Sequence, residues 1–400
     1  MQEFPDRSSD DPEQAVDWRE VEQEAAAPAV PAGEGAASHV PVTEVRVADV
    51  APEEWDRMVL GFDDVLQEQV QSFNEVRRAP DKLRRLAVYA DGELTGAALV
   101  RLVKVPMLGC TISSLRWGPL WRRTGRPATP ATMDLVLRAL TDQLCRREKG
   151  FLMIMPRPDP DMEAVPGAVL QRLGFQSMPP LSNPLRYFAR VDHGPEALRA
   201  NFSQKWRYNL KKAEAAGLET ELVEGEAGMN EILGLYHEML ARKKFVDYSP
   251  IDTLAHRLAN PLEILRPRMF VTRKDGVPVA MAVVDCCGDT ASFLYGATAD
   301  EALPLRAGYA LQWAVLCHLS RQPAIRWYAL GGGGSATCPL HQFKRGLVGK
   351  VGVILHELPP HFLAEGSCAK IVGRLAMSGR ALRDRVREPL SQMIPVRLGR

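Results

Sequence analysis

The sequence predicts an α/β protein built from two domains that repeat one order of elements. The chain has 400 residues, a length that corresponds to about two to three domains. Two β-hairpins are expected, at 86–103 and 269–282, because each contains an Asp-Gly pair that favours the tight turn between antiparallel strands. In both halves a strand and a helix precede the hairpin, and a helix and a further strand follow it. We therefore expect two tandem domains with a substrate cleft between them.

Composition and charge are those of an ordinary globular chain. Hydrophobic residues make up 46% and charged residues 25% of the sequence, which allows a sizeable core. The formal net charge of +1 gives no bulk attraction for nucleic acid or membranes, so any basic site has to be local. The seven cysteines lack metal-ligand spacing, so we expect no metal site and a reducing compartment. With no signal-peptide pattern and no apolar run of about 18 residues, the expected location is the cytoplasm.

A change of composition marks both ends of the chain. Residues 1–40 are acidic and rich in Ala, Pro and Gly, so we expect a disordered tail that cannot bury enough apolar surface to fold. The further divisions are an N-terminal domain at 41–192, basic connecting helices at 193–217, a C-terminal domain at 218–358 and a basic amphipathic segment at 359–400. The last segment is typical either of a helix on the anionic inner face of a membrane or of a helix docked on the protein with a solvated basic face.

Local signals define the elements of the first domain. Pro52, followed by two glutamates, is typical of a first helical turn, because the missing donor of proline is not needed there and acids favour the helix N-terminus. A second helix is expected at 132–147 from its recurring apolar positions. Apolar runs of strand character lie at 42–47, 151–155 and 181–191.

The second domain repeats this order. A strand at 218–223 and a helix at 229–243 come before its hairpin, and a strand at 291–297, a helix from Gly308 and a strand at 325–330 come after it. The helix from Gly308 ends before Pro323, because proline lacks the backbone donor and clashes with the preceding turn.

The last of these strands leads into the most informative stretch of the chain. Four glycines follow it at 331–334, and Lys344 stands further on between Phe343 and Gly346. Neither a P-loop nor a dinucleotide-binding fold is indicated, because no Gly-Lys-Ser/Thr and no spaced acidic partner accompany the glycines. The glycines are either a flexible strand exit or a place where a substrate approaches the backbone closely. A strand, a glycine loop and a lysine on that loop outline a site at a strand end.

This stretch resembles the C-terminal half of the Fem-type peptidyltransferases, enzymes that add amino acids to peptidoglycan precursors without the ribosome. The residues that carry the resemblance are Tyr295-Gly296, Gln312-Trp313, Tyr328 to Gly332, and Phe343 to Leu347. Two positions depart from the family pattern: Ala329 stands where many members have aspartate, and Leu347 replaces a phenylalanine.

The resemblance continues in the N-terminal half, so that it covers about 45 to 358. Gly118-Pro119 matches an Arg-Gly-Pro-Val segment of the family, with Arg116 displaced by one position. The order of strands and helices is also similar to that of the N-acetyltransferase (GNAT) fold. The resemblance therefore implies two tandem GNAT-like domains with mixed, mostly antiparallel sheets.

A basic helix is expected between the two domains, at 202–213. Phe202, Trp206, Leu210 and Ala213 recur on one face, which leaves Lys205, Arg207, Lys211 and Lys212 on the remaining faces. Fem-type enzymes have a similar helix at this place. Clustered ammonium and guanidinium groups can hold the diphosphate of a precursor or the backbone of a tRNA. The alternative is a solvated face of a connecting helix.

These residues indicate acyl transfer from an activated carboxyl group to an amine. Orientation of two bound substrates supplies much of the reduction in the activation barrier of such a reaction. A cation or hydrogen-bond donor is also needed at the carbonyl oxygen that becomes negative. Lys344 is the candidate for that role, and Tyr295 and His341 are the other candidate catalytic residues. The candidate substrate- or phosphate-binding residues, besides the basic helix, are Arg116, Gly331, Gly332 and Tyr328.

The resemblance also implies the substrates: an aminoacyl-tRNA as donor, a peptidoglycan or other cell-envelope precursor peptide as acceptor, and no further cofactor. Two alternatives stay open. One is an acyl-CoA-dependent N-acyltransferase, since Gly308 and Ala310 keep part of the GNAT pyrophosphate loop, although Leu305 stands where that loop has Gln or Arg. The other is a non-catalytic module that binds an envelope precursor, which the departures at Ala329 and Leu347 favour.

Overall fold

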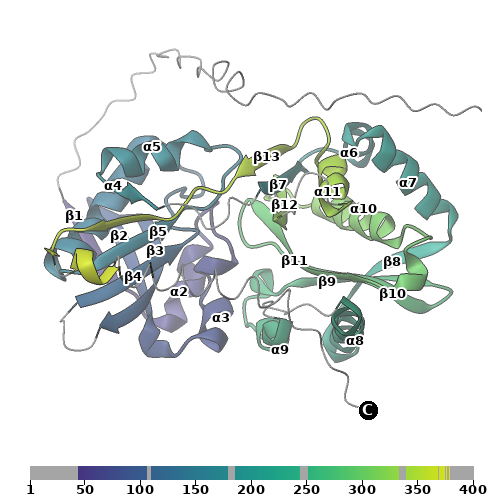
Figure 1. The fold of residues 1–400 in the computed structure, drawn as a ribbon, viewed down its shortest axis with the longest axis horizontal. Coiled ribbons are helices and arrows are strands. Elements are labelled where there is room, and N and C mark those ends of the chain that lie inside the picture. Colours follow the sequence, from purple (N-terminus) through teal and green to yellow (C-terminus); the bar gives the residue numbers. More distant parts are fainter. Residues whose placement is uncertain are drawn as a thin grey trace, which may run out of the picture. The chain divides into compact units, whose positions relative to one another are not determined.

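The computed structural model describes residues 44–105, 110–178, 185–243, 251–332, 339–367 and 369–373, together with positions 375 and 378. All of these residues belong to one compact unit, 43–400. The acidic tail expected at 1–40 lies outside the described residues. The described strands form two seven-stranded sheets (Figure 1).

The first sheet and the helices packed on it form the N-terminal lobe. The strand order is β1 (Val45–Asp49), β2 (Leu83–Ala90), β3 (Glu93–Val105), β4 (Cys110–Arg116), β5 (Phe151–Met155), β14 (His361–Ala364) and β6 (Gln176–Ser177). The helices are α2 (Pro52–Val59), η1 (Gln67–Gln69), α3 (Gln71–Asn74), η2 (Glu75–Arg77), η3 (Pro80–Lys82), α4 (Pro130–Thr141), its π-helical continuation η4 (Asp142–Arg147) and α5 (Ala164–Arg172). Among these described strands, only β4 and β5 pair in parallel.

The second sheet and its helices form the C-terminal lobe. The strand order is β13 (Val353–His356), β7 (Leu185–Arg190), β12 (Trp327–Gly332), β11 (Thr290–Thr298), β10 (Val277–Asp285), β9 (Arg268–Lys274) and β8 (Leu218–Val223). The helices α6 (Pro195–Asn201), α7 (Gln204–Ala215), α10 (Ala307–Leu319) and α11 (Pro339–Val348) share one apolar core with the sheet. The helices α8 (Gly225–Lys243) and α9 (Leu254–Leu258) belong to a second core, and η5 (Ile251–Thr253), η6 (Glu263–Leu265) and η7 (Asp300–Ala302) are short 3₁₀ turns. Among the described pairs of this sheet, only β11 and β12 run in parallel.

The predicted fold class is confirmed: both sheets are mixed and mostly antiparallel, and helices cover them. The two expected hairpins are present as β2–β3 and β9–β10. At each turn the Asp-Gly pair has positive φ at both residues, 48° and 82° in the first hairpin and 51° and 80° in the second. Aspartate and glycine tolerate this region better than other residues, which is why the local sequence is enough to locate these turns.

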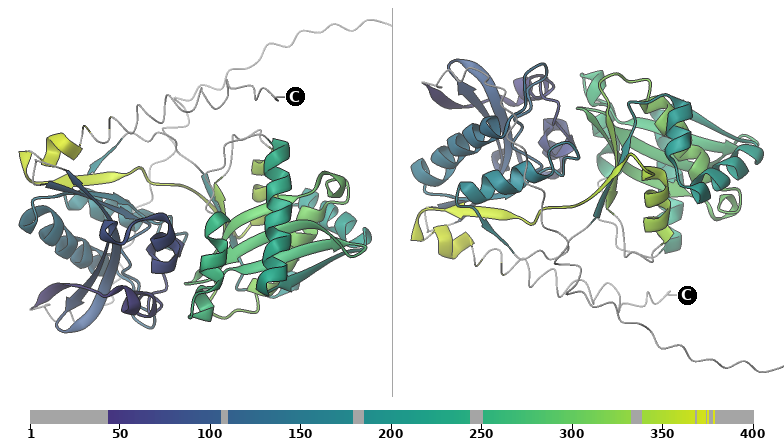
Figure 2. Two further views of the ribbon diagram at one scale, coloured as in Figure 1. Left: turned by 90° about the horizontal axis from the view of Figure 1, so that it is seen from below. Right: turned by 90° about the horizontal axis from the view of Figure 1, so that it is seen from above.

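The two lobes exchange strands, and here the structure differs from the expected boundaries. β7, which lies within the expected N-terminal domain at 41–192, pairs with β12 and β13 of the second sheet. β14, which lies within the expected amphipathic segment at 359–400, pairs with β5 and β6 of the first sheet. Figure 2 shows this yellow strand against the blue N-terminal sheet in both views. The residues of a strand do not by themselves indicate which strand it pairs with. The order of elements in the sequence therefore misplaces both domain boundaries.

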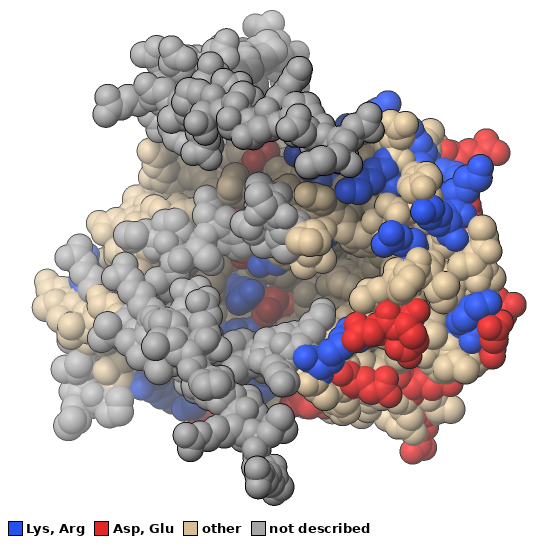
Figure 3. Space-filling model, turned by 45° about the vertical axis from the view of Figure 1, so that its right-hand side comes forward, with Lys and Arg blue, Asp and Glu red and all other residues tan. Residues whose placement is uncertain are grey.

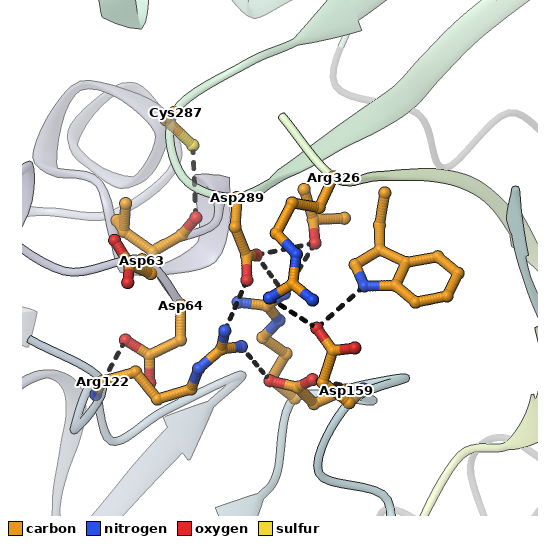
Figure 4. Close-up of polar contacts among 12 residues, drawn as sticks. Asp63, Asp64, Arg122, Asp159, Cys287, Asp289 and Arg326 are labelled. Carbon is orange, nitrogen blue, oxygen red and sulfur yellow. Dashed lines mark hydrogen bonds and ion pairs between the residues drawn. The ribbon is translucent and has the colours of Figure 1, made fainter. Parts of the chain in front are cut away.

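An ion network that is nearly closed to solvent joins the two lobes (Figure 4). Arg122 of the N-terminal lobe donates to Asp159 at 2.6 Å and to Asp289 of the C-terminal lobe at 2.7 Å. Arg157 donates to the other oxygen of Asp289 at 2.8 Å and to Thr290 at 2.7 Å. Because water does not reach these charges, each depends on the others for its stabilisation. The network therefore fixes the turn between β10 and β11 against the N-terminal lobe.

The same turn also packs closely on the backbone of the N-terminal lobe. The Asp289 N–H donates to the Asp63 carbonyl at 2.7 Å, and the Cys287 thiol donates to the Val65 carbonyl at 3.7 Å. A Cβ atom on Gly288 would lie 2.5 Å from the Val65 oxygen and 2.6 Å from the Asp63 oxygen. Only glycine fits at that position.

Asp64, beside this network, makes the stability of the protein depend on pH. Its carboxylate accepts from the backbone N–H groups of Trp121 and Arg122 at 3.0 and 3.3 Å. Burial nevertheless raises the pKa of Asp64 from 3.8 to about 6, against the attraction of Arg157. A rise of this size corresponds to about 3 kcal/mol. The protonated form stabilises the fold fully below about pH 3.8, and this contribution is lost as the pH rises through about 6.

We therefore expect Asp64→Asn to flatten the pH dependence of the unfolding free energy between about pH 4 and 6. Asparagine keeps the shape of the side chain but has no proton to release. Urea unfolding at several pH values measures the effect, and Asp81→Asn, a change at an exposed aspartate, is the control. An Asp64→Asn profile as steep as that of the unchanged protein would contradict the assignment.

No helix among the described residues is both long and apolar enough to cross a membrane.

Candidate active site

A cavity of about 510 Å³ lies between the lobes, and we call it the interlobe cavity. The N-terminal lobe contributes residues of η1, α3, η2, β3 and the end of β4, and the C-terminal lobe contributes residues of β7, β11 and the end of β12. In Figure 3 the surface is hollowed, and charged side chains of both signs are visible at the base of the hollow. A second cavity, of about 670 Å³, lies within the C-terminal lobe between β8, α8 and α9, and no predicted site residue lines it.

Guanidinium groups dominate the charge of the interlobe cavity. The arginines among its described lining residues are Arg77, Arg78, Arg101, Arg116 and Arg186. Glu68 is the one carboxylate among the same residues. Arg101 donates to it at 2.5 Å, and Arg116 Nε lies 3.3 Å from its other oxygen. Since positive charge is in excess, the cavity is suited to an anionic ligand.

The arginines lie close enough to repel one another. Burial lowers the pKa of Arg101; Glu68 opposes this, and the charges of Arg78, Arg116 and Arg77 lower the pKa further. Such repulsion is relieved when an anion enters among the guanidinium groups.

Trp117 forms part of the same wall. Its indole N–H donates to Glu357 at 3.4 Å, and Glu357 also accepts from Arg186 at 2.6 Å. The guanidinium carbons of Arg116 and Arg186 lie 5.4 and 5.5 Å from the indole ring centroid. Trp117 has a φ of 53°, a strained conformation for a bulky residue, so the surrounding contacts hold it in place.

Lys344 lies beside the end of β12, next to the lining residue Gly331, and is not itself among the described residues that line the cavity. Gly331, which has a φ of 74°, lines the cavity, and the next residue, Gly332, accepts a hydrogen bond from the Lys344 ammonium. Lys344 is only 7% exposed. It belongs to helix α11 and not to a glycine-bounded loop, so that part of the sequence interpretation is wrong. Helix geometry places Lys344 one turn after His341 on the same face.

His341 and Lys344 both lie near Tyr187 of β7. The Tyr187 hydroxyl and His341 Nδ1 are 2.5 Å apart, and the Lys344 ammonium lies 5.8 Å from the Tyr187 ring centroid. Tyr187 lines the interlobe cavity, whereas His341 is buried behind it. The expected proximity of His341 to Lys344 is therefore present, with Tyr187 between His341 and the cavity.

Tyr295 of β11 lines the cavity from the C-terminal lobe. Its hydroxyl is buried, lies near Thr253 and makes no hydrogen bond of normal geometry among the described residues. Burial raises the pKa of Tyr295 well above its ordinary value. The hydroxyl therefore stays neutral, and in this structure it is closed to solvent.

Two sets of predicted residues lie away from the cavity. Tyr328 is fully buried between β12 and α10, and its hydroxyl donates to Gln312 at 3.0 Å, so its expected role in substrate binding does not fit the structure. On α7, Lys205, Lys211 and Lys212 are exposed, while Arg207 donates to the Ala200 carbonyl at 3.1 Å. None of these α7 residues is among the described residues that line the interlobe cavity.

Sequence reasoning missed most of the arginine set. Of its members only Arg116 is among the predicted site residues, because Arg77, Arg78, Arg101 and Arg186 come from separate segments. One signal was available: Arg101 interrupts an otherwise apolar stretch of β3, where a charged residue needs a specific reason.

Comparison with known proteins identifies the fold of this chain. A family model described as an acetyltransferase (GNAT) domain matches residues 200–345, and no curated protein matches the chain. The crystal structure of FemX is similar at 16% identity, with a TM-score of 0.66, over 82% of this chain and 99% of that one. This chain has the tandem GNAT fold of FemX. The expectation of two tandem GNAT-like domains, drawn from the Fem-type resemblance, is thereby confirmed for the fold.

Two further structures are similar at lower scores than FemX. One is the C-terminal domain of a putative lysylphosphatidylglycerol synthetase from Agrobacterium fabrum, with 15% identity, a TM-score of 0.46 and coverage of 82% of this chain and 95% of that chain. The other is a tandem GNAT protein from the clavulanic acid biosynthesis pathway, with 14% identity, a TM-score of 0.39 and coverage of 81% and 99%.

Proposed function

We propose that this protein transfers an aminoacyl group from an aminoacyl-tRNA to an amine on a cell-envelope precursor. The observation that carries the proposal is the position of Lys344, whose ammonium lies against Gly332 at the end of β12, beside a cavity lined with arginines. The tandem GNAT fold and the Fem-type motif around Lys344 support it.

The reaction requires a bound donor, a bound amine and a cation at the carbonyl oxygen, and Lys344 supplies the cation. The amine nitrogen attacks the ester carbonyl of the donor, a C–N bond forms, and the C–O bond to the ribose breaks. The amine proton goes in net terms to the leaving ribose oxygen. Lys344 is the cation that stabilises the negative carbonyl oxygen while the carbon is tetrahedral. Its buried surroundings strengthen the interaction because water screens it less.

The acceptor lies in the interlobe cavity in this proposal. Five arginines converge there from both lobes, so a precursor that carries phosphate or carboxylate groups finds charge-assisted donors on either side. Tyr295 also lines the cavity, from the C-terminal lobe. The acceptor amine then points toward the end of β12, where Lys344 lies.

The donor tRNA contacts the exposed lysines of α7. Trp206, Leu210 and Ala213 bury one side of this helix and leave Lys205, Lys211 and Lys212 on the surface. The alternative is a solvated face without a ligand.

The lysines can be tested as a set. Lys205, Lys211 and Lys212 changed together to alanine are expected to weaken tRNA binding at low salt, and to reduce the slope of log K against log salt by about 2 to 3. The fold remains intact because the buried face is untouched. Filter binding across a salt series measures both quantities. Equal affinity and slope in the variant and the unchanged protein would support the solvated face.

An acyl-CoA-dependent N-acyltransferase is the second candidate, because the matched family model describes an acetyltransferase domain. Incubation with charged tRNA and, separately, with a set of acyl-CoA thioesters, each with amine acceptors and mass detection, separates the two. Transfer from acyl-CoA but not from charged tRNA would overturn the first proposal. Muropeptides from a strain without this protein provide the cellular comparison. Transfer from neither donor, together with unchanged muropeptides, would favour a non-catalytic binding module.

A further inference from the structure

We propose that Glu68 makes the interlobe cavity selective for an acceptor that carries an ammonium group close to its anionic group. The inference rests on the proposed function in one respect, namely that the acceptor lies in this cavity. It concerns which acceptors are accepted, and it can be examined by binding alone.

Glu68 is an exception among the charged groups of the cavity. Five guanidinium groups line it, and Glu68 is the one carboxylate among the described lining residues. The Glu68 side chain is about 10% exposed, so its charge is poorly screened. A cavity that bound only polyanions would gain nothing from this carboxylate, because it repels them.

Glu68 is also held firmly in place. Its carboxylate contacts Arg101 and Arg116, and its backbone carbonyl accepts from the Asn74 amide at 3.1 Å. The same Asn74 side chain accepts from Arg101 at 3.0 Å and donates to the Val70 carbonyl at 2.8 Å. The contacts tie η1 to α3, so the carboxylate stays in the cavity when a ligand binds.

The neighbouring arginines keep donor capacity for a ligand. The Arg116 side chain is 33% exposed, and its Nε, which lies 3.3 Å from Glu68, is buried. Arg77 and Arg78 line the cavity as well, and Arg78 donates only to the Arg77 carbonyl in the described contacts. An anionic group can therefore bind these arginines without displacing Glu68.

The geometry then discriminates between two kinds of ligand. A simple anion enters beside the Glu68 carboxylate and is repelled by it. A zwitterion places its anionic group on the arginines and its ammonium group against Glu68, so the repulsion becomes attraction. The acceptor class is thus an amine with a phosphate or carboxylate a few bonds away.

Two small probes, phosphoethanolamine and ethyl phosphate, differ in whether they carry an ammonium group beside the phosphate. Calorimetry at low salt is expected to show that the unchanged protein binds phosphoethanolamine about tenfold more tightly than ethyl phosphate, one ion pair being enough for a tenfold change. Glu68→Gln is expected to bind ethyl phosphate more tightly and phosphoethanolamine less tightly, so that the preference disappears or reverses. Glu226→Gln, which makes the same change of charge at the second cavity, is expected to keep the preference for phosphoethanolamine.

The ratio of the affinities for phosphoethanolamine and ethyl phosphate decides whether Glu68 has this role. Equal binding of both probes by the unchanged protein, no binding of either at millimolar concentration, or an undiminished preference in Glu68→Gln would each overturn the proposal. If Glu68→Gln does not fold, Glu68→Asp retracts the carboxylate by one methylene and is expected to reduce the preference. A preference that is present in a protein without transfer activity supports the role of Glu68 and counts against the proposed function alone.

Discussion

Lys344→Ala is expected to lower turnover by about 10²–10³-fold, the usual result of removing one donor from an oxyanion site. The ammonium is placed by the buried face of α11 and anchored on the Gly332 carbonyl, so water does not take its position readily. Lys344→Arg is expected to restore only part of the activity, because a planar guanidinium does not occupy the place of a compact ammonium.

The measurement is single-turnover transfer with saturating donor and acceptor, which separates the chemical step from binding. Lys350→Ala, a change at an exposed lysine just after the same helix, is the control and is expected to leave turnover unchanged. Thermal unfolding of all variants shows whether the fold is kept. Full activity in a folded Lys344→Ala protein would remove the lysine from the mechanism.

Asp289→Ala is expected to cost about 3 to 5 kcal/mol of unfolding free energy, because it leaves buried guanidinium groups without their counter-ion. Both carboxylate oxygens are engaged, one by Arg122 and one by Arg157. Arg122 keeps its pairing with Asp159 at 2.6 Å, so the loss falls mainly on Arg157, whose side chain is only 6% exposed.

Denaturant unfolding provides the comparison, with the surface pair Arg126–Glu93 as the matched control. Both members of that pair are largely exposed, at 66% and 69%. Arg126→Ala is therefore expected to change the unfolding free energy by about 0 to 1 kcal/mol. Similar losses in the two variants would mean that the network between the lobes contributes no more than a surface ion pair.

The parts of the fold that follow from local chemistry could be predicted from the sequence. The two Asp-Gly hairpins depend on backbone conformations that few residues adopt, and the buried face of α7 depends on apolar spacing within one helix. The exchange of β7 and β14 could not be predicted, because strand pairing depends on distant segments. For the same reason the arginine set emerges only when the chain is folded.

The error over Lys344 has a specific cause. Gly346 suggested a loop, yet it lies inside α11, where a Cβ atom would come within 2.9 Å of the Ser203 hydroxyl and 3.1 Å of the Trp206 ring. Glycine is required there for close packing between α11 and α7 and not for a turn. A single sequence does not distinguish these two uses of glycine.

The position of β14 in the first sheet has a consequence for synthesis on the ribosome. β6 pairs with β14 among the described strands, and β14 also covers one edge of β5. The N-terminal lobe is translated first, but its sheet stays incomplete until β14 has been translated, after every strand of the second sheet. Until then the edge of β5 carries unpaired backbone groups of the kind that invite pairing with other nascent chains. Folding of the N-terminal lobe is therefore completed only after the strands of the C-terminal lobe have been translated.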